Sequence, residues 1–164
     1  MNIEKVQEHI QELANSLQKL FSNVKIDFAF GDNRPLIGDW KNEKNLGILG
    51  GDNVGDKSGL YIFTTSNQQV IYIGKATKNN LHHRVWDHVK TPEIMPDGWR
   101  NFPKTSFNSC AENPDLVTSV REGRIRLYVF TVSDPEVTSL IEVYLQIQHI
   151  KSHGKLPAFN KQIG

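Results

Sequence analysis

The stretch GLYIFTTSNQQVIYIGKA, residues 59–76, decides the fold of this chain. Its two runs rich in Ile, Tyr, Phe and Val are separated by TSNQ, which is the pattern of a β-hairpin. If the turn centres on Ser66 and Asn67, Tyr61 lies opposite Tyr72. Because side chains alternate between the two faces of a strand, these tyrosines would share one face of the sheet. The apolar residues expected on the other face are Leu60, Ile62, Ile71 and Ile73.

A helix of about ten residues is predicted after the hairpin and the turn KATKNN. Its apolar row consists of Leu81, Val85 and Val89, which recur every four residues. Arg84 and His88 also stand four apart, so they share a neighbouring face. We therefore expect these two side chains to be able to address one ligand.

A strand and a long helix are predicted in the last third of the chain. The run IRLYVFTV, residues 125–132, is typical of a strand, and Asp134 before a proline indicates the start of a helix. This helix should end near Ser152 because Gly154 follows it. Residues 91–123 contain prolines and aromatic side chains with little periodicity, so we expect mostly loop with one short helix. Such a long connection is often functional.

Residues 1–58 form the predicted extension that precedes the hairpin. They begin with an amphipathic helix, in which apolar residues recur at spacings of three and four: Ile3, Val6, Ile10, Leu13, Leu17 and Leu20. We expect this stripe to pack on its own domain, and the alternative is a helix pair across a homodimer. Residues 31–58 are rich in Gly, Asn and Asp and are expected to be loop. The main domain is expected to be residues 59–164.

The composition is that of an ordinary globular protein, with 38% hydrophobic and 23% charged residues in a chain of 164. The amino-terminal residues resemble neither a signal peptide nor a membrane span, so we expect a cytoplasmic protein with no membrane partner. The single Cys110 cannot form an internal disulfide, and no second thiol completes a zinc site. His149 and His153 are expected on the surface. Any catalytic metal should therefore be held by oxygen.

The net charge of +1 conceals an uneven distribution along the chain. Residues 1–58 hold seven Lys and Arg against nine Asp and Glu, whereas residues 59–164 hold twelve against nine. Within the second part, residues 75–104 form a mildly basic stretch. This stretch is compatible with contacts to nucleic-acid phosphates and also with a solvated surface.

Taken together, these residues resemble the GIY-YIG nuclease family. The two family tripeptides correspond to Gly59-Leu60-Tyr61, with leucine in place of isoleucine, and to Tyr72-Ile73-Gly74. The remaining positions that match the family pattern are Lys75, Ala76, Leu81, Arg84, His88, Glu142 and Asn160. The resemblance implies an α/β (α+β) domain with a small three-stranded central sheet flanked by helices. The amino-terminal helix would be an addition to that fold.

The resemblance also implies a metal-dependent endonuclease that hydrolyses phosphodiester bonds of DNA, or of RNA. Glu142 would hold one Mg²⁺ or Mn²⁺, because magnesium prefers oxygen ligands and keeps part of its hydration shell. Arg84 would clamp the phosphate, since its planar guanidinium can engage two oxygens at once. The product would carry a 5′-phosphate and a 3′-hydroxyl.

The other residues of the expected catalytic set supply proton transfer and positioning. Tyr61 is the expected general base, although a tyrosine pKa of about 10 leaves only about one part in a thousand as phenolate at neutral pH. We attribute the necessary lowering of this pKa to the metal and to Lys75. Tyr72 and His88 are expected to position water and phosphate, with His88 sharing the proton transfer. Asn160 is expected to hold the site by hydrogen bonds.

Two alternatives belong to other functional classes. One is a noncatalytic module on the same fold that binds nucleic acid or protein, although the presence of all the principal positions argues against it. The other is an interaction domain built around the amino-terminal helix. No separate DNA-reading motif is evident, so specificity would come from residues 91–123, from residues 1–58, from dimerisation or from a partner. Gly74 is expected to be needed because a side chain there would obstruct backbone or substrate.

Overall fold

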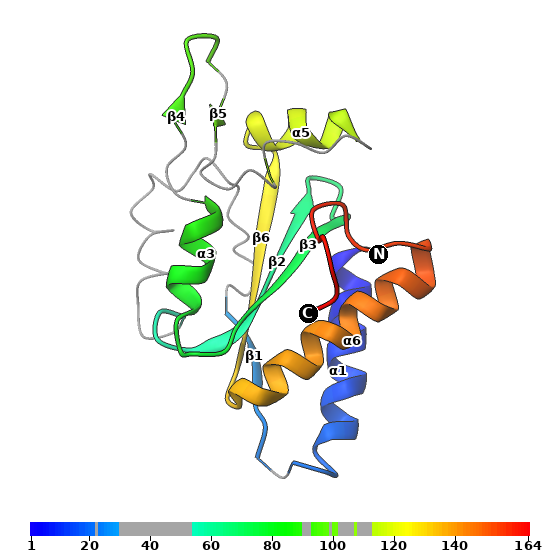
Figure 1. The fold of residues 1–164 in the computed structure, drawn as a ribbon. Coiled ribbons are helices and arrows are strands. Elements are labelled where there is room, and N and C mark those ends of the chain that lie inside the picture. Colours follow the sequence, from blue (N-terminus) through cyan, green and yellow to red (C-terminus); the bar gives the residue numbers. More distant parts are fainter. Residues whose placement is uncertain (22, 30–53, 90–92, 99, 102–106, 108–112) are drawn as a thin grey trace.

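A computed structural model describes residues 1–21, 23–29, 54–89, 93–98, 100–101, 107 and 113–164. Its centre is an antiparallel four-stranded sheet with strand order β1-β6-β2-β3 (Figure 1). The strands of this sheet are β1 (Ile26–Phe28), β2 (Ser58–Thr65), β3 (Val70–Ala76) and β6 (Ile125–Val132). The helices are α1 (Ile3–Leu17), α3 (Leu81–Val89), α5 (Pro114–Arg121) and α6 (Pro135–His153). Two short strands, β4 (Glu93–Ile94) and β5 (Arg100–Asn101), pair with each other apart from the main sheet.

Strand β1 extends the sheet beyond the three strands predicted from the sequence. It pairs with β6 from Ile26 opposite Val132 to Phe28 opposite Phe130, and the rings of Phe28 and Phe130 stack with centroids 5.0 Å apart. Three residues are too few to show an alternating pattern, so β1 is defined by its partner strand rather than by its own sequence. The predicted number of three strands is therefore wrong, whereas the α+β class is confirmed.

Helices cover both faces of the sheet (Figure 1). Helices α1 and α6 lie against one face, where their apolar residues form a core with Leu60, Ile62 and Ile73. Helix α3 lies against the other face, where Leu81 and Val85 form a second core with the aromatic residues of β2. The sheet lies between these two helical layers, and β3 forms one of its edges. Side chains from both layers can therefore meet around its outer edge.

The hairpin of β2 and β3 confirms that the two tyrosines share a face but not that they pair directly. Tyr61 lies opposite Gly74, and Tyr72 lies opposite Phe63. The register shifts next to Phe63, where Ile71 has no partner, as in a β-bulge. Ile71 belongs to the core on the Tyr61 side of the sheet, so its predicted position on the opposite face is wrong.

The turn of the hairpin accounts for the rest of this difference in register. Thr65 donates its backbone N–H to the carbonyl of Gln69 at 2.9 Å, which closes a loop of three residues instead of two. Gln68, the last loop residue, adopts a positive φ of 63°. One residue more in the loop and one in the bulge together shift the pairing by two positions, and they place glycine under the Tyr61 ring.

The apolar stripe of α1 packs within its own chain. Ile3, Val6, Ile10 and Leu17 are buried in the core shared with α6 and the sheet, as the preferred expectation required. Leu20 lies beyond the end of the helix and is 77% exposed, so the predicted stripe extends one residue too far. A homodimer through α1 would have to use other residues of the helix. The division of the chain at residue 58 stays a prediction.

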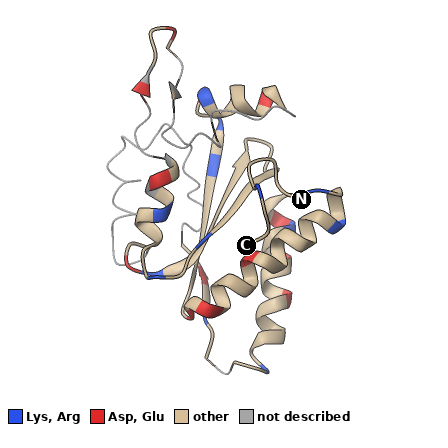
Figure 2. Ribbon diagram, in the orientation of Figure 1, with Lys and Arg blue, Asp and Glu red and all other residues tan. Residues whose placement is uncertain are grey.

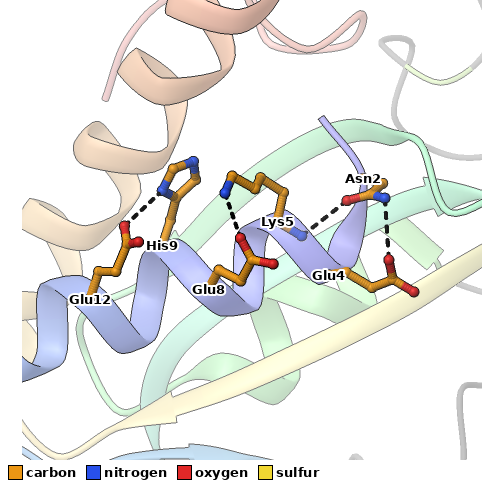
Figure 3. A network of polar contacts seen from close by, with 6 residues as sticks. All are labelled: Asn2, Glu4, Lys5, Glu8, His9 and Glu12. Atoms are coloured by element: carbon orange, nitrogen blue, oxygen red, sulfur yellow. Dashed lines mark hydrogen bonds and ion pairs between the residues drawn. The ribbon is translucent and has the colours of Figure 1, made fainter.

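The exposed side of α1 carries a series of local polar contacts (Figure 3). The Asn2 side chain caps the helix by accepting the Lys5 N–H at 3.0 Å, and the Lys5 ammonium contacts Glu8. His9 lies 3.4 Å from Glu12 one turn farther on. The solvated ion pair of Lys5 and Glu8 contributes little to stability. The buried stripe, rather than this charged side, fixes the helix on the domain.

Helix α6 begins and ends where the sequence predicts. The Asp134 carboxylate caps its start by accepting the N–H groups of Glu136 at 2.9 Å and Val137 at 3.1 Å. Gly154 ends the helix in the left-handed conformation, with a φ of 73°. These two ends fix the register of the helix, and with it the side chains that face β3.

His149, near the end of α6, is not on the surface as predicted. Its side chain is buried, and its Nδ1–H donates to the Lys155 carbonyl at 2.7 Å. Burial lowers the pKa of His149 below its ordinary value. His153 is exposed, as predicted, and its ring stacks on that of His149. The chain after Gly154 folds back over the helix end, which the spacing of the two histidines does not reveal.

Several expectations concern residues outside the described part of the chain. Most of the predicted loop 31–58 lies there, as do Cys110 and two basic residues of the stretch 75–104, Lys90 and Lys104. The short helix expected within residues 91–123 is α5. In the described ranges, every helix is too short or too polar to cross a bilayer.

Candidate active site

The predicted site residues converge on a pocket of about 430 Å³ at the outer edge of β3. The pocket is lined from both faces of the sheet, by β2, β3, α3, α6 and the tail that follows α6. Six of the seven predicted residues line it: Tyr61, Tyr72, Lys75, Arg84, Glu142 and Asn160. The seventh, His88, lies behind the pocket and contacts Tyr61. One concave site thus brings together two tyrosine hydroxyls, three charged side chains (Lys75 of β3, Arg84 of α3 and Glu142 of α6) and the amide of Asn160.

Gly74 makes room for Tyr61 at the edge of the sheet. A Cβ at position 74 would lie 2.5 Å from Tyr61 Cζ and 2.7 Å from the Tyr61 hydroxyl oxygen. The ring therefore occupies the space that any other residue at position 74 would fill. The need for glycine is confirmed, and the group that requires the space is the Tyr61 ring itself.

An aromatic cluster surrounds the Tyr61 hydroxyl. The hydroxyl lies 3.2 Å from His88 Nε2, within hydrogen-bond distance, and the ring centroids of Tyr61 and Tyr72 are 5.9 Å apart. Phe63 and Phe107 pack against His88 on its other sides, with centroid distances of 6.0 and 5.3 Å. Tyr61 is fully buried and His88 is almost so. Packing from several directions therefore fixes the phenol and the imidazole relative to each other.

The protein environment opposes a free Tyr61 phenolate. Burial raises the pKa of Tyr61 well above its ordinary value, and the neighbouring Tyr72 raises it further. Burial also raises the pKa of Tyr72. Arg84 lowers the Tyr61 pKa, but burial outweighs it, and Lys75 does not contribute, so the lowering expected from Lys75 is wrong. The lowering expected from a bound metal stays a prediction. If Tyr61 transfers a proton at neutral pH, it needs a partner that accepts its own proton, and His88 lies in that position.

These raised tyrosine pKa values predict a loss of stability in alkali. Above pH 10 the unfolded chain releases tyrosine protons that the folded chain still holds, so the free energy of unfolding falls with rising pH. Each such group contributes up to about 1.4 kcal/mol per pH unit. We expect Tyr61→Phe to make this fall shallower in urea unfolding measured from pH 9 to 11.5. Equal slopes for parent and variant would show that Tyr61 titrates normally.

Glu142 projects from α6 into the pocket and is 4% exposed. Its Oε2 atom lies 2.7 Å from Lys75 Nζ but makes no hydrogen bond with a described residue, so the contact is an ion pair without hydrogen-bond geometry. A buried carboxylate oxygen with unused acceptor capacity suits a hard divalent cation. In the part of the chain that is described, no cluster of three or more His, Cys, Asp or Glu residues surrounds a metal position. Glu142 fits a metal bound by one carboxylate, water and substrate.

Lys75 is paired with Glu142 rather than with Tyr61. The Lys75 side chain is 28% exposed, so its ammonium can reach solvent as well as the carboxylate. A cation at Glu142 would compete with this ammonium for Oε2. Lys75 released from Glu142 would then be available to an anion in the same pocket.

Arg84 reaches the pocket from α3, on the face opposite to Glu142. Its side chain is exposed and lines both the main pocket and an adjoining hollow of about 250 Å³. That hollow also contains Lys75 and Lys78 and no acidic residue. Arg84 is therefore open to an anion in either hollow and stays in contact with solvent.

Asn160 and Gln146 hold the edge strand β3 in place. The Asn160 side chain accepts the Ile73 N–H at 2.9 Å and donates to the Ile73 carbonyl at 2.8 Å, as a neighbouring strand would. The expected hydrogen bonds of Asn160 are thus present, and they act on backbone. Gln146 is 1% exposed and accepts the Gly164 N–H at 2.8 Å. Both amides position β3 and the tail around the pocket.

The sequence interpretation overlooked Gln146 and the tail residues Phe159 and Lys161, which also line the pocket. Gln146 follows Glu142 by four positions, so helical spacing places both on one face and could have identified it. The tail residues have no comparable pattern. Their place in the pocket depends on the reversal of the chain after α6.

Comparisons with protein-family models, with curated proteins and with solved structures find no match for this chain.

Proposed function

We propose that this chain is a metal-dependent endonuclease that hydrolyses phosphodiester bonds of DNA. The observation that carries the proposal is the meeting of Tyr61, Arg84 and Glu142 in one pocket, from β2, α3 and α6. Phosphodiester hydrolysis requires a positioned water, a proton acceptor and positive charge on the phosphoryl oxygens. The pocket supplies a candidate group for each requirement. The resemblance to GIY-YIG nucleases supports the same reaction, and RNA is an alternative substrate.

In the proposed reaction, Tyr61 accepts a proton from the attacking water while its own proton passes to His88 Nε2. The water oxygen forms the new bond to phosphorus, and the bond from phosphorus to the 3′ oxygen breaks. The leaving oxygen takes a proton from solvent, which gives a 3′-hydroxyl and a 5′-phosphate. Because His88 receives the tyrosine proton, this route needs no free phenolate.

Charge on the phosphate is met from two sides of the pocket. Arg84 would engage the nonbridging oxygens through its planar guanidinium. A Mg²⁺ or Mn²⁺ held by Glu142 would supply Lewis-acid stabilisation of the charge that develops on the phosphoryl group. Tyr72 lines the same pocket and would orient water or phosphate through its hydroxyl.

Cleavage of supercoiled plasmid tests the proposal directly. Nicked or linear product should form with Mg²⁺ or Mn²⁺ and be absent with EDTA. We expect Arg84→Ala to slow cleavage roughly 10- to 30-fold, since one charged hydrogen bond contributes about 1.5–2 kcal/mol. Arg121→Ala, in α5, removes the same charge outside the pocket and should cleave like the parent.

The main alternative is a noncatalytic module that binds nucleic acid or protein through the same pocket. The raised pKa of Tyr61 and the ion pair between Lys75 and Glu142 favour it, because both features oppose hydrolysis. Tight plasmid binding without cleavage in any metal would support this module. If the plasmid is neither cleaved nor bound, a nucleic-acid substrate is contradicted.

A further inference from the structure

Three neighbouring hollows follow β3 from one end to the other. The first is the hollow of Lys75, Lys78 and Arg84 at the end of the strand, and the second is the candidate active site. The third, which we call the turn hollow, lies at the start of β3 beside the β2–β3 turn and has a volume of about 460 Å³. Its charged or titratable lining residues are Arg124, His149, His153 and Lys155. The three hollows therefore form a series along the edge of the sheet.

The charges of the three hollows are far from balanced. Their lining residues include six Lys and Arg, namely Lys75, Lys78, Arg84, Arg124, Lys155 and Lys161, and one acidic residue, Glu142. The whole chain has nineteen Lys and Arg against eighteen Asp and Glu. The pocket between α1 and β1, by comparison, is lined by one lysine and one aspartate. Figure 2 shows basic positions near both ends of β3, on the turn before α3 and on the tail after α6.

We propose that the turn hollow binds the phosphate backbone of the substrate strand beyond the bond that is cut. This inference rests on the proposed function, and it assigns Arg124 and Lys155 to substrate binding. Arg124 contacts Glu122, but its side chain is 56% exposed and keeps access to a ligand in the hollow. Lys155 lines the same hollow from the tail. Neither residue touches the reacting phosphate.

The length of β3 sets the reach of this contact. Five residue steps separate Gly74, which packs against Tyr61 of the candidate active site, from Gln69, at the turn hollow, which corresponds to roughly 17 Å of strand. One strand of B-form DNA places a phosphate about every 3.4 Å along its axis. The turn hollow would therefore contact phosphates roughly three to five nucleotides from the scissile bond. Substrates whose strand ends fewer than about three nucleotides from the scissile bond, in the direction of the turn hollow, should therefore bind less tightly.

Salt dependence of DNA binding measures the number of phosphate contacts. Binding of a fluorescein-labelled 30-base-pair duplex would be followed by anisotropy in EDTA, across 50–400 mM KCl. Each phosphate contact contributes about 0.9 to the slope of log K against log salt. We expect the double variant Arg124→Ala with Lys155→Ala to reduce the slope by about 1.8, because it loses two such contacts. If the plots of log K against log salt for the parent and the double variant converge at 1 M salt, the affinity of the variant at 0.1 M is roughly 60-fold lower than that of the parent.

A matched double variant and Arg84→Ala separate the possible results. Lys19→Ala with Lys151→Ala removes two exposed lysines outside the hollows and should keep the parent slope. If the turn-hollow variant binds like the parent while Arg84→Ala binds more weakly, the inference is overturned and the proposed function stands. If the parent binds no DNA at any salt concentration, both are overturned. Thermal unfolding of each variant would confirm that the changed residues leave the fold intact.

Discussion

Glu142→Gln is expected to lower the rate of plasmid cleavage by at least 10³-fold. Loss of metal-dependent charge stabilisation removes several kcal/mol, and about 4 kcal/mol corresponds to a factor of 10³. Glutamine keeps the shape of the buried side chain but lacks the charge that attracts a divalent cation. The fold should survive, because Lys75 keeps access to solvent after its partner is lost. Single-turnover cleavage with saturating enzyme measures the effect.

Two comparisons make this prediction specific to the pocket. Glu136→Gln makes the same chemical change at an exposed position of α6 and should cleave like the parent. Mn²⁺ should raise the thermal unfolding temperature of the parent but not that of Glu142→Gln, because a ligand stabilises only the state that binds it. Metal-dependent cleavage by Glu142→Gln within tenfold of the parent rate would show that another group holds the metal.

Strong local patterns explain which parts of the fold the sequence predicts well. The hairpin runs, the strand at 125–132 and the capped helix α6 each carry several agreeing patterns within a few residues. Strand β1 has three residues and gains its definition from β6, so no local pattern predicts it. The hairpin register depends on a three-residue loop and a bulge, which the pattern of apolar residues does not specify.

In the candidate site too, the sequence predicts relations between residues close together in the chain better than contacts between distant ones. Helical spacing predicts that Arg84 and His88 share one face of α3; in the structure Arg84 lines the pocket, whereas His88 contacts Tyr61 from behind it. The pairing of Lys75 with Glu142 joins residues 67 positions apart and emerges only when α6 packs on β3. Burial of Tyr61 likewise depends on tertiary packing, so the sequence does not predict the direction in which its pKa shifts.

The second large effect is expected from Gly74→Ala, a residue with no chemistry of its own. The added methyl group would lie 2.5 Å from Tyr61 Cζ, so the ring or the edge strand must move. Cores resist such overpacking at a cost of about 1–3 kcal/mol, and the rings of Phe63, Tyr72 and His88 pack against Tyr61 and restrict where it can move. Displacement of the hydroxyl from His88 breaks the proposed proton path. Since a misplacement of about 1 Å can cost about 10²-fold in rate, we expect cleavage to fall by at least that factor.

Gly98→Ala provides the control that separates this local effect from general loss of stability. Position 98, between β4 and β5, has open space around it but a φ of 81°, so alanine there is strained at a place outside the pocket. We expect Gly98→Ala to destabilise the fold by about 1 kcal/mol and to cleave at the parent rate. Gly74→Ala should lose activity at temperatures where both variants are fully folded by circular dichroism. Full activity in folded Gly74→Ala would mean that the position of the Tyr61 hydroxyl does not limit the reaction, and another group would then have to accept the proton from water.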